Sequence, residues 1–260
     1  MQFSFLPASF RATRLTSFSG AAAELPMEMR IEILATDYDG TLAHDGVVDE
    51  VTLAALDRFR ASGRRLVMVT GREIEDLRRV FTHLDRFDLV VGENGALLYR
   101  PVSQTVKLLC APPAKPLVER LRAVPVTPFS VGHAIVATRE PYETVVLETI
   151  KELGLELQVI FNKGAVMILP TGVNKATGLK AGLLDIGSSP ERTVGIGDAE
   201  NDHAFLEICA VGVAVANALP MLKERADFVT AGARGAGVVE LIERILANDL
   251  SDVEKRQPRV

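Results

Sequence analysis

Two aspartates stand two positions apart directly after the first apolar run of the sequence. Asp37 and Asp39 belong to the pentapeptide DYDGT at residues 37–41, and residues 31–36 before it are typical of a buried strand. Alternate side chains of an extended chain point the same way, so both carboxylates face one site. Such a pair needs a cation or a shared proton, and Mg²⁺ suits because it binds carboxylates and phosphate oxygens. The alternative is a surface turn, where Asp and Gly are common.

A second acidic group lies in the segment GIGDAEND at residues 195–202. Its glycines suggest a dinucleotide-binding fingerprint, but Glu200 stands where the third glycine of that fingerprint belongs. Asp198 follows a predicted strand, and Asp202 lies one helical turn further on the same side. Capping of the helix by Asp198 is compatible with metal binding. Two acidic groups at the tips of neighbouring parallel strands predict one divalent-metal site.

A hydroxyl and a lysine could bind the anionic partner of such a metal. Thr70 and Gly71 end the second predicted strand and open a helix, where a hydroxyl and free N–H groups form an anion site. Lys175 begins a later helix. An ordinary N-cap threonine and a solvated lysine are the alternatives.

These residues follow strands that alternate with amphipathic helices, which predicts an α/β fold. The pattern describes a Rossmann-like, doubly wound parallel sheet with helices on both faces, over residues 30–100 and 174–250. Ligands of such sheets bind beyond the carboxyl ends of the strands.

Residues 101–173 break this rhythm. They hold eight of the 13 prolines, together with strand-like segments at 104–109, 134–138, 157–161 and 165–169. Helix-like segments lie at 114–123 and 141–153. We therefore expect an inserted α+β domain that splits the larger one.

The composition limits the partners. The 260-residue chain has a net charge of −5, so nucleic acid is a poor candidate partner, and its apolar runs are too short to cross a membrane. Two cysteines without metal spacing favour the reducing cytoplasm. Residues 1–29 read as a disordered extension or a misassigned start, with an organelle-import peptide as the alternative. Residues 251–260 read as a tail.

Together the motifs resemble the haloacid dehalogenase superfamily of phosphohydrolases, in particular the Cof-type branch with a large α/β cap. The resemblance covers about residues 30–248 and predicts that residues 101–173 form the cap. Four motifs carry it, in the family's order: D-x-D-G-T at 37–41, Thr70, Lys175 and G-D-x-x-N-D at 197–202.

The resemblance implies a role for each motif residue. Asp37 would be the nucleophile that forms an aspartyl-phosphate, and Asp39 would protonate the leaving oxygen and then activate water. The metal set is Asp37, Asp39 through its backbone carbonyl, Asp198 and Asp202, with Asn201 beside it. The phosphoryl-binding set is Thr70, Gly71 and Lys175.

A compact cap is similar to those of phosphoglycolate phosphatases and sucrose-phosphate-type phosphatases, which favours a small phosphorylated acid or sugar as substrate. Candidate substrate contacts are His133, Arg139, Asn162 and Lys163 in the cap, Asn94 after the third strand, and Asn201. The alternative is a solvated side chain for the four cap residues and a turn residue for Asn94.

We therefore predict a Mg²⁺-dependent phosphatase, monomeric or homodimeric, that acts on a small phosphorylated metabolite. A phosphomutase of the same superfamily is the alternative enzyme. A receiver-like signalling module is the alternative of another class, although such a module needs no cap.

Overall fold

The structure is a computed structural model that describes residues 30–254. The expectations for residues 1–29, and for residues 255–260 of the tail, fall outside the described part of the chain. The start of the predicted tail is not free, because Val253 is 8% exposed and packs on the main hydrophobic core.

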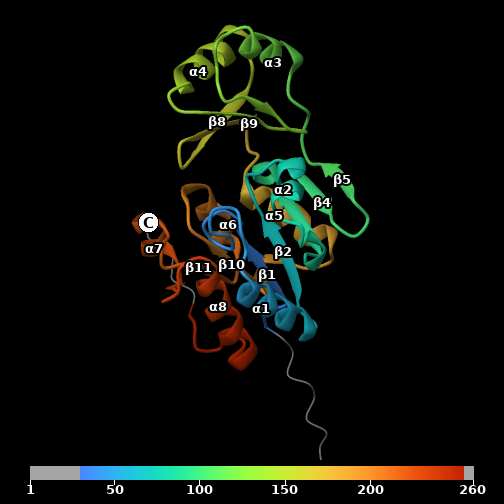
Figure 1. The fold of residues 1–260 in the computed structure, drawn as a ribbon, viewed down its shortest axis with the longest axis vertical. Helices are drawn as coiled ribbons and strands as arrows, with labels where there is room; N and C mark the ends of the chain where they lie inside the picture. The colour runs from blue at the N-terminus through green and yellow to red at the C-terminus, as the bar shows by residue number, and fades with distance from the viewer. Residues whose placement is uncertain (1–29, 255–260) are drawn as a thin grey trace, which may run out of the picture.

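An eight-stranded sheet forms the larger of two lobes, which we call the core domain (Figure 1). Its strand order is β12-β11-β10-β1-β2-β3-β4-β5, and the strands from β12 to β3 are parallel. The prediction of a doubly wound α/β sheet is confirmed. The strands are β1 (Ile33–Thr36), β2 (Arg65–Val69), β3 (Leu89–Gly92), β4 (Leu97–Arg100), β5 (Thr105–Leu108), β10 (Thr193–Gly197), β11 (Val211–Ala214) and β12 (Phe228–Val229).

Helices cover both faces of this sheet. Helices α1 and α8 pack against each other on one face, and α5 and α6 pack against each other on the opposite face. The central strands are buried on both faces, because every residue of β1, β3, β10 and β11 is buried. The helices are α1 (Glu50–Ala61), α2 (Ile74–Val80), α5 (Lys175–Asp185), α6 (His203–Ile208), α7 (Pro220–Arg225) and α8 (Gly235–Asn248).

One segment assigned to the insertion belongs instead to the core domain. Residues 104–109 contain β5, which pairs antiparallel with β4 at the edge of the large sheet. All four residues of β5 are exposed, so its sequence lacks the buried face that would mark it as part of this sheet. Backbone pairing with a hairpin neighbour places it there.

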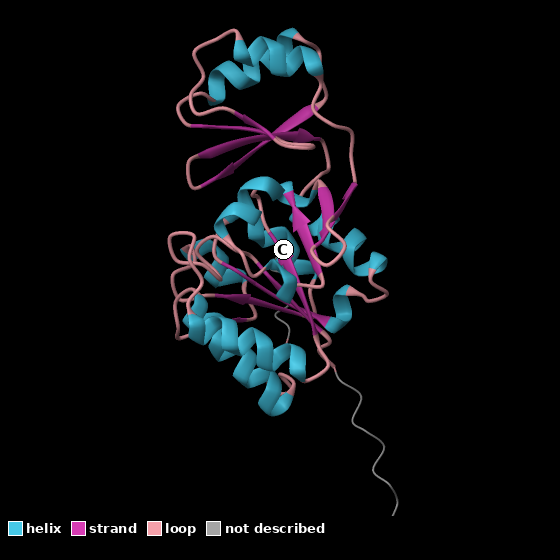
Figure 2. Ribbon diagram, turned by 45° about the vertical axis from the view of Figure 1, so that its right-hand side comes forward, coloured by secondary structure: helices cyan, strands magenta, loops and turns pink. Residues whose placement is uncertain are grey.

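The remainder of the insertion forms a separate lobe, the cap, above the carboxyl ends of the parallel strands (Figures 1 and 2). Its antiparallel sheet has the order β6-β7-β9-β8, with two helices on the side away from the core domain (Figure 2). The elements are α3 (Lys115–Arg122), β6 (Ser130–Val131), β7 (Val136–Arg139), α4 (Glu143–Glu152), β8 (Leu157–Asn162) and β9 (Ala165–Pro170).

One apolar cluster stabilises the cap internally, and a second joins the cap to the core domain. The first joins α3 and α4 to the cap sheet, with Leu117, Val146 and Ile168 at most 2% exposed. The second lies under that sheet and includes Ala96 of the core domain together with Met167 of the cap. The cap therefore has its own apolar core and a separate contact with the domain below it.

The return from the cap into α5 is fixed by local chemistry. The side chain of Asn174 accepts a hydrogen bond from the backbone N–H of Thr177, and the Thr177 hydroxyl accepts one from the Asn174 N–H. This reciprocal capping box satisfies two N–H groups at the start of the helix. It fixes Lys175 as the first residue of α5, directly beside the carboxyl ends of the strands.

Candidate active site

Three buried carboxylates from two strands converge at the carboxyl end of the large sheet. Asp37 follows β1, and Asp198 and Asp202 follow the adjacent parallel strand β10. One ligand oxygen of each lies within 4.8 Å of the others, and the residues are 5%, 3% and 0% exposed. We call them the three-carboxylate cluster. The two acidic motifs, 160 residues apart in the sequence, thus form one site.

Lys175 neutralises part of this cluster from inside the protein. The residue is 1% exposed, and its Nζ lies 2.6 Å from Asp37 Oδ1 and 2.5 Å from Asp202 Oδ1. The second oxygen of Asp202 accepts hydrogen bonds from the backbone N–H groups of Asp198 and Ala199, at 2.8 and 2.9 Å. Lys175 is therefore a buried, ion-paired residue and not a solvated one. Asp202 forms an ion pair with Lys175 through one oxygen and accepts hydrogen bonds from the loop after β10 through the other.

Burial makes two of the three carboxyl groups harder to ionise, because it raises their pKa values. Burial and then the charge of Asp202 raise the pKa of Asp37 to about 7, although Lys175 acts in the opposite direction. Burial also raises the pKa of Asp198, against the effect of Lys163. Burial alone would lower the pKa of Lys175, but Asp202 and Asp37 outweigh it and raise that pKa.

This donor set fits a hard divalent cation. Three carboxylates within 4.8 Å share one buried lysine, so a positive ion would relieve their repulsion and favour ionised Asp37. The backbone carbonyl of Asp39 lies at the same place, because Lys163 donates both to it and to Asp198. Hard oxygen ligands of this kind suit Mg²⁺.

The carboxylate of Asp39 lies apart from the cluster and faces the cap. Arg72 holds it with two hydrogen bonds, 2.6 Å from Nε to Oδ2 and 2.7 Å from Nη2 to Oδ1. Arg72 in turn pairs with Asp76 of α2. The two aspartates of the first motif therefore have different surroundings. Asp37 is buried beside Asp198 and Asp202, whereas the side chain of Asp39 is 40% exposed and is held by Arg72.

Thr70 and Gly71 lie at the end of β2 beside these residues. Thr70 is 1% exposed, and its hydroxyl accepts a hydrogen bond from the Arg72 N–H at 3.1 Å. Gly71 lines the cavity between the core domain and the cap. The threonine thus shapes the turn that carries Arg72, and an anion role for its hydroxyl stays a prediction.

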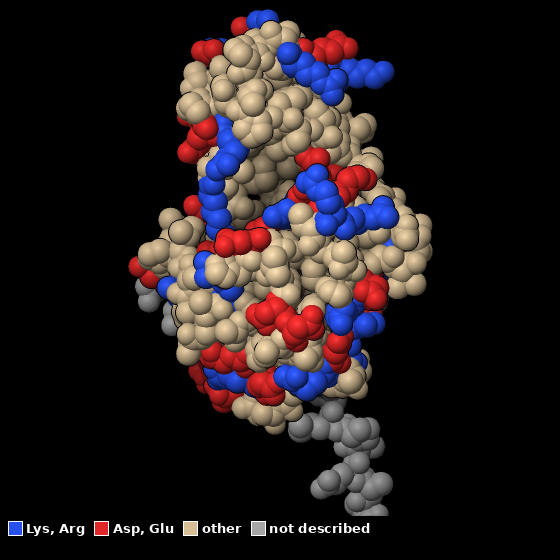
Figure 3. Space-filling view, in the orientation of Figure 1, with Lys and Arg blue, Asp and Glu red and all other residues tan. Residues whose placement is uncertain are grey.

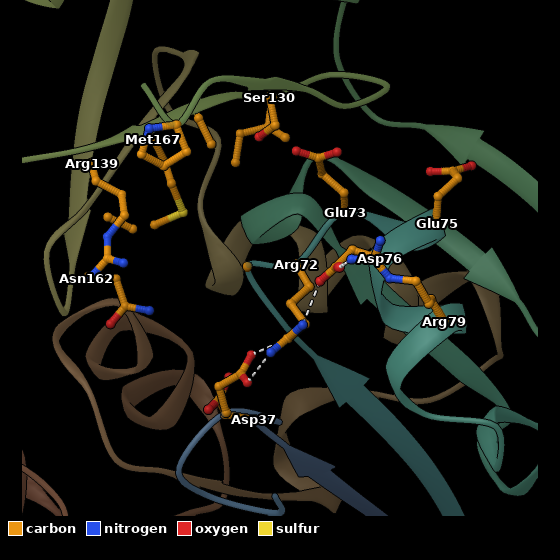
Figure 4. Close-up of a pocket in the computed structure, with 16 residues that line it drawn as sticks. Asp37, Arg72, Glu73, Glu75, Asp76, Arg79, Ser130, Arg139, Asn162 and Met167 are labelled. Carbon is orange, nitrogen blue, oxygen red and sulfur yellow. Dashed lines mark hydrogen bonds and ion pairs between the residues drawn. The ribbon is translucent and has the colours of Figure 1, made fainter. Parts of the chain in front are cut away.

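A cavity of about 930 Å³ separates the two lobes above this site (Figures 3 and 4). Its floor includes Asp37, Asp39 and Gly71, and its roof comes from the cap sheet. Arg139 and Asn162 line the roof and therefore face the cavity as predicted for substrate contacts. Whether they bind substrate stays a prediction.

The other candidate contacts are placed differently. Asn201 donates from its side chain to the Asn94 side chain at 3.0 Å, and both approach Gly71 at the cavity floor. His133 contacts Glu75 at 3.0 Å where the cap meets α2, and it is absent from the cavity lining. Because Glu75 itself lines the cavity, His133 lies next to the cavity lining, and its role as a substrate contact stays a prediction.

Two functional candidates were missed by sequence reasoning. Arg72 could have been recognised, because it directly follows Thr70-Gly71 at a strand end where anions bind. Glu93 gives no such signal. It is 0% exposed and accepts hydrogen bonds from the backbone N–H groups of His133, Ala134 and Ile135 in the cap, at 2.9, 2.7 and 3.0 Å.

A family profile matches most of the chain. The profile of the haloacid dehalogenase-like hydrolases covers residues 34–109 and 128–242. The chain belongs to this family, and the resemblance drawn from its motifs is confirmed. The prediction of an enzyme is confirmed as well, because this is a family of hydrolases.

Relatives align over nearly their whole length. The chain is 30% identical over 223 residues to phosphoglycolate phosphatase 2 of Saccharolobus solfataricus, an alignment that covers 84% of this chain and 93% of that protein. It is 30% identical over 222 residues to a phosphoglycolate phosphatase of Methanothermobacter thermautotrophicus, covering 82% and 98%. The sucrose-phosphatase of Synechocystis shares the fold, with a TM-score of 0.64 at 22% identity over 83% of this chain and 98% of that one.

Within residues 30–254, no helix is both long enough and apolar enough to span a bilayer.

Proposed function

We propose that this protein is a Mg²⁺-dependent phosphatase that hydrolyses a small phosphomonoester through a phosphorylated Asp37. The observation that carries the proposal is the three-carboxylate cluster with Lys175, set beneath a cavity whose floor also holds the Arg72-bound Asp39. A buried carboxylate beside a cation site and a second carboxylate at the cavity edge suit two different tasks.

The two carboxylates divide the chemistry between them. The Asp37 carboxylate attacks phosphorus, the bond to the leaving oxygen breaks, and protonated Asp39 donates its proton to that oxygen. Asp39 then takes a proton from water, whose oxygen attacks the phosphorus of the aspartyl-phosphate and releases inorganic phosphate and free Asp37. Lys175 orients Asp37, and the N–H groups after β2 bind phosphoryl oxygens.

The metal would be held by the carboxylates of Asp37 and Asp198 and by the Asp39 carbonyl, with Asp202 behind them. When bound, Mg²⁺ supplies positive charge that offsets the negative charge of the transferring phosphoryl oxygens.

Phosphoglycolate and sugar phosphates are the proposed substrates. Support comes from the relatives named phosphoglycolate phosphatase and from a cavity closed on one side by the cap. Arg139 adds a cation to the roof of that cavity and has no ion-pair partner within the described chain. A carboxylate on the leaving group, as in phosphoglycolate, would match this charge.

A phosphate-release assay tests the proposal. The protein is incubated with phosphoglycolate, sugar phosphates, nucleotides and pyridoxal phosphate, with Mg²⁺ or with EDTA, and substrates are ranked by kcat/KM. We expect release to require Mg²⁺ and to fall roughly 10³-fold or more in Asp37→Asn. The control Asp85→Asn changes an exposed carboxylate of the core domain and should keep full activity.

The outcomes separate the alternatives. Full activity in purified Asp37→Asn contradicts the nucleophile assignment, and activity that persists after chelation contradicts the metal requirement. Transfer of phosphate to a second sugar hydroxyl instead of water would indicate the phosphomutase alternative. A phosphorylated Asp37 that never turns over would indicate the receiver-like alternative.

A further inference from the structure

The tip of a cap hairpin reaches the metal-binding end of the core domain. Strands β8 and β9 are joined by Lys163 and Gly164 alone, with φ values of 47° and 79°. Positive φ at both positions is typical of the tight two-residue turn of a β-hairpin. Asn and Gly favour that conformation, whereas lysine gains nothing from it. The turn therefore presents a lysine where the backbone would favour a smaller residue.

The lysine ammonium contacts two oxygens of the core domain. Its Nζ lies 2.9 Å from the carbonyl oxygen of Asp39 and 2.7 Å from Asp198 Oδ2. A Cβ on Gly40 would come within 2.4 Å of Asp198 Oδ2 and 2.7 Å of Lys163 Nζ. Only glycine at position 40 leaves room for this approach. The contact therefore depends on Lys163 in the cap and on Gly40 in the core domain.

The Asp39 carbonyl and the Asp198 carboxylate are both among the groups assigned above to the metal. Asp198 is 3% exposed, and its carboxylate also accepts hydrogen bonds from the neutral Thr41 hydroxyl at 3.3 Å and the Asn217 amide at 3.4 Å. The carboxylates of Asp37 and Asp202 lie within 4.8 Å of it. An ammonium and a divalent cation cannot both sit against the same pair of oxygens, because the two positive charges would repel each other at contact distance. One of them must leave when the other binds.

We propose that Lys163 competes with the divalent metal for Asp39 O and Asp198, and thereby couples metal binding to the position of the β8–β9 hairpin. Metal binding releases the hairpin tip from the core domain, and a docked hairpin weakens metal binding by the same factor. The inference rests on the metal site of the proposed function. It adds that the position of one cap hairpin depends on whether the metal is bound.

Calorimetric titration with Mg²⁺, in the absence of substrate, gives the first test. Lys163→Asn keeps a residue that tolerates the turn but is too short to reach Asp198. We expect its Mg²⁺ dissociation constant to be about fivefold lower than that of the wild type, the change that corresponds to one partly exposed ion pair. The control Lys115→Asn removes an exposed lysine of α3 in the same lobe and should leave that constant unchanged.

Hydrogen exchange separates displacement from a general charge effect. In the wild type, Mg²⁺ should increase amide exchange over residues 157–170, which form the hairpin. In Lys163→Asn the same amides should exchange fast with or without Mg²⁺.

Three results would overturn the inference. The first is an equal Mg²⁺ affinity of Lys163→Asn and wild type, and the second is tighter binding without any Mg²⁺ effect on hairpin exchange in the wild type. The third is a wild type that binds no Mg²⁺, which removes the metal from the proposed function as well. With either of the first two results, a Mg²⁺-dependent phosphatase activity would still stand.

Discussion

Glu93 gives the sharpest test of how the cap is attached. This carboxylate belongs to the core domain, is 0% exposed and accepts hydrogen bonds from three backbone N–H groups in the turn before β7. Alanine at position 93 would leave those three donors without partners. An unsatisfied buried donor costs about 1–3 kcal/mol, and water entering the space would reduce that figure. We therefore expect Glu93→Ala to lower the free energy of unfolding by about 3–5 kcal/mol.

Urea denaturation followed by circular dichroism measures this loss, and hydrogen exchange locates it. The greatest increase in exchange should fall on residues 130–137, which carry the three donors. Glu119→Ala removes an exposed glutamate of α3 and serves as the control, with a change below about 0.5 kcal/mol. A loss below about 1 kcal/mol in Glu93→Ala, or unchanged exchange over residues 130–137, would refute the reasoning that these hydrogen bonds fix the cap.

Three further predictions concern the site and its supports. Arg72→Gln should lower kcat roughly tenfold and shift the pH profile of kcat, because Asp39 loses the arginine that orients it; an unchanged profile contradicts this. Gly178→Ala should destabilise the protein by about 1–3 kcal/mol in urea, since its Cβ would lie 2.4 Å from the Gly95 Cα; full stability would mean that α5 can shift. Burial raises the pKa of Glu93, so its stabilising effect is complete below the ordinary glutamate value and declines as pH rises through the raised pKa. The difference in unfolding free energy between wild type and Glu93→Gln should therefore shrink from acid to neutral pH, and a growing difference contradicts the shift.

The sequence was sufficient to predict the core domain and its acidic residues. Periodic apolar runs mark the buried parallel strands, and the motif aspartates follow them directly, so their convergence on one edge follows from the parallel sheet. The pairing of Lys175 with Asp37 was not visible, because it depends on how the chain re-enters the core domain after the cap. Its position at the start of a later helix made that lysine a candidate, and the resemblance to the family gave it a phosphoryl-binding role.

Contacts between the lobes were beyond sequence reasoning. Glu93 meets backbone groups of the cap, and backbone groups carry no sequence signal. Strand β5 has no buried residue, so no hydrophobic pattern could assign it to the large sheet. The sequence marked Lys163 as a candidate substrate contact, but its ion pair with Asp198 of the core domain depends on how the hairpin is placed.

The two links between the lobes are not equivalent. The outgoing chain leaves from β5, an exposed edge strand, whereas the returning chain passes through the Asn174 capping box straight into Lys175. Gly95 lies against this return, where a Cβ would come within 2.0 Å of the Asn174 carbonyl. A foreign lid grafted onto this scaffold could be joined after β5 with considerable freedom. The second junction of such a lid must lie before Asn174, because a change in the capping box would move Lys175 away from Asp37.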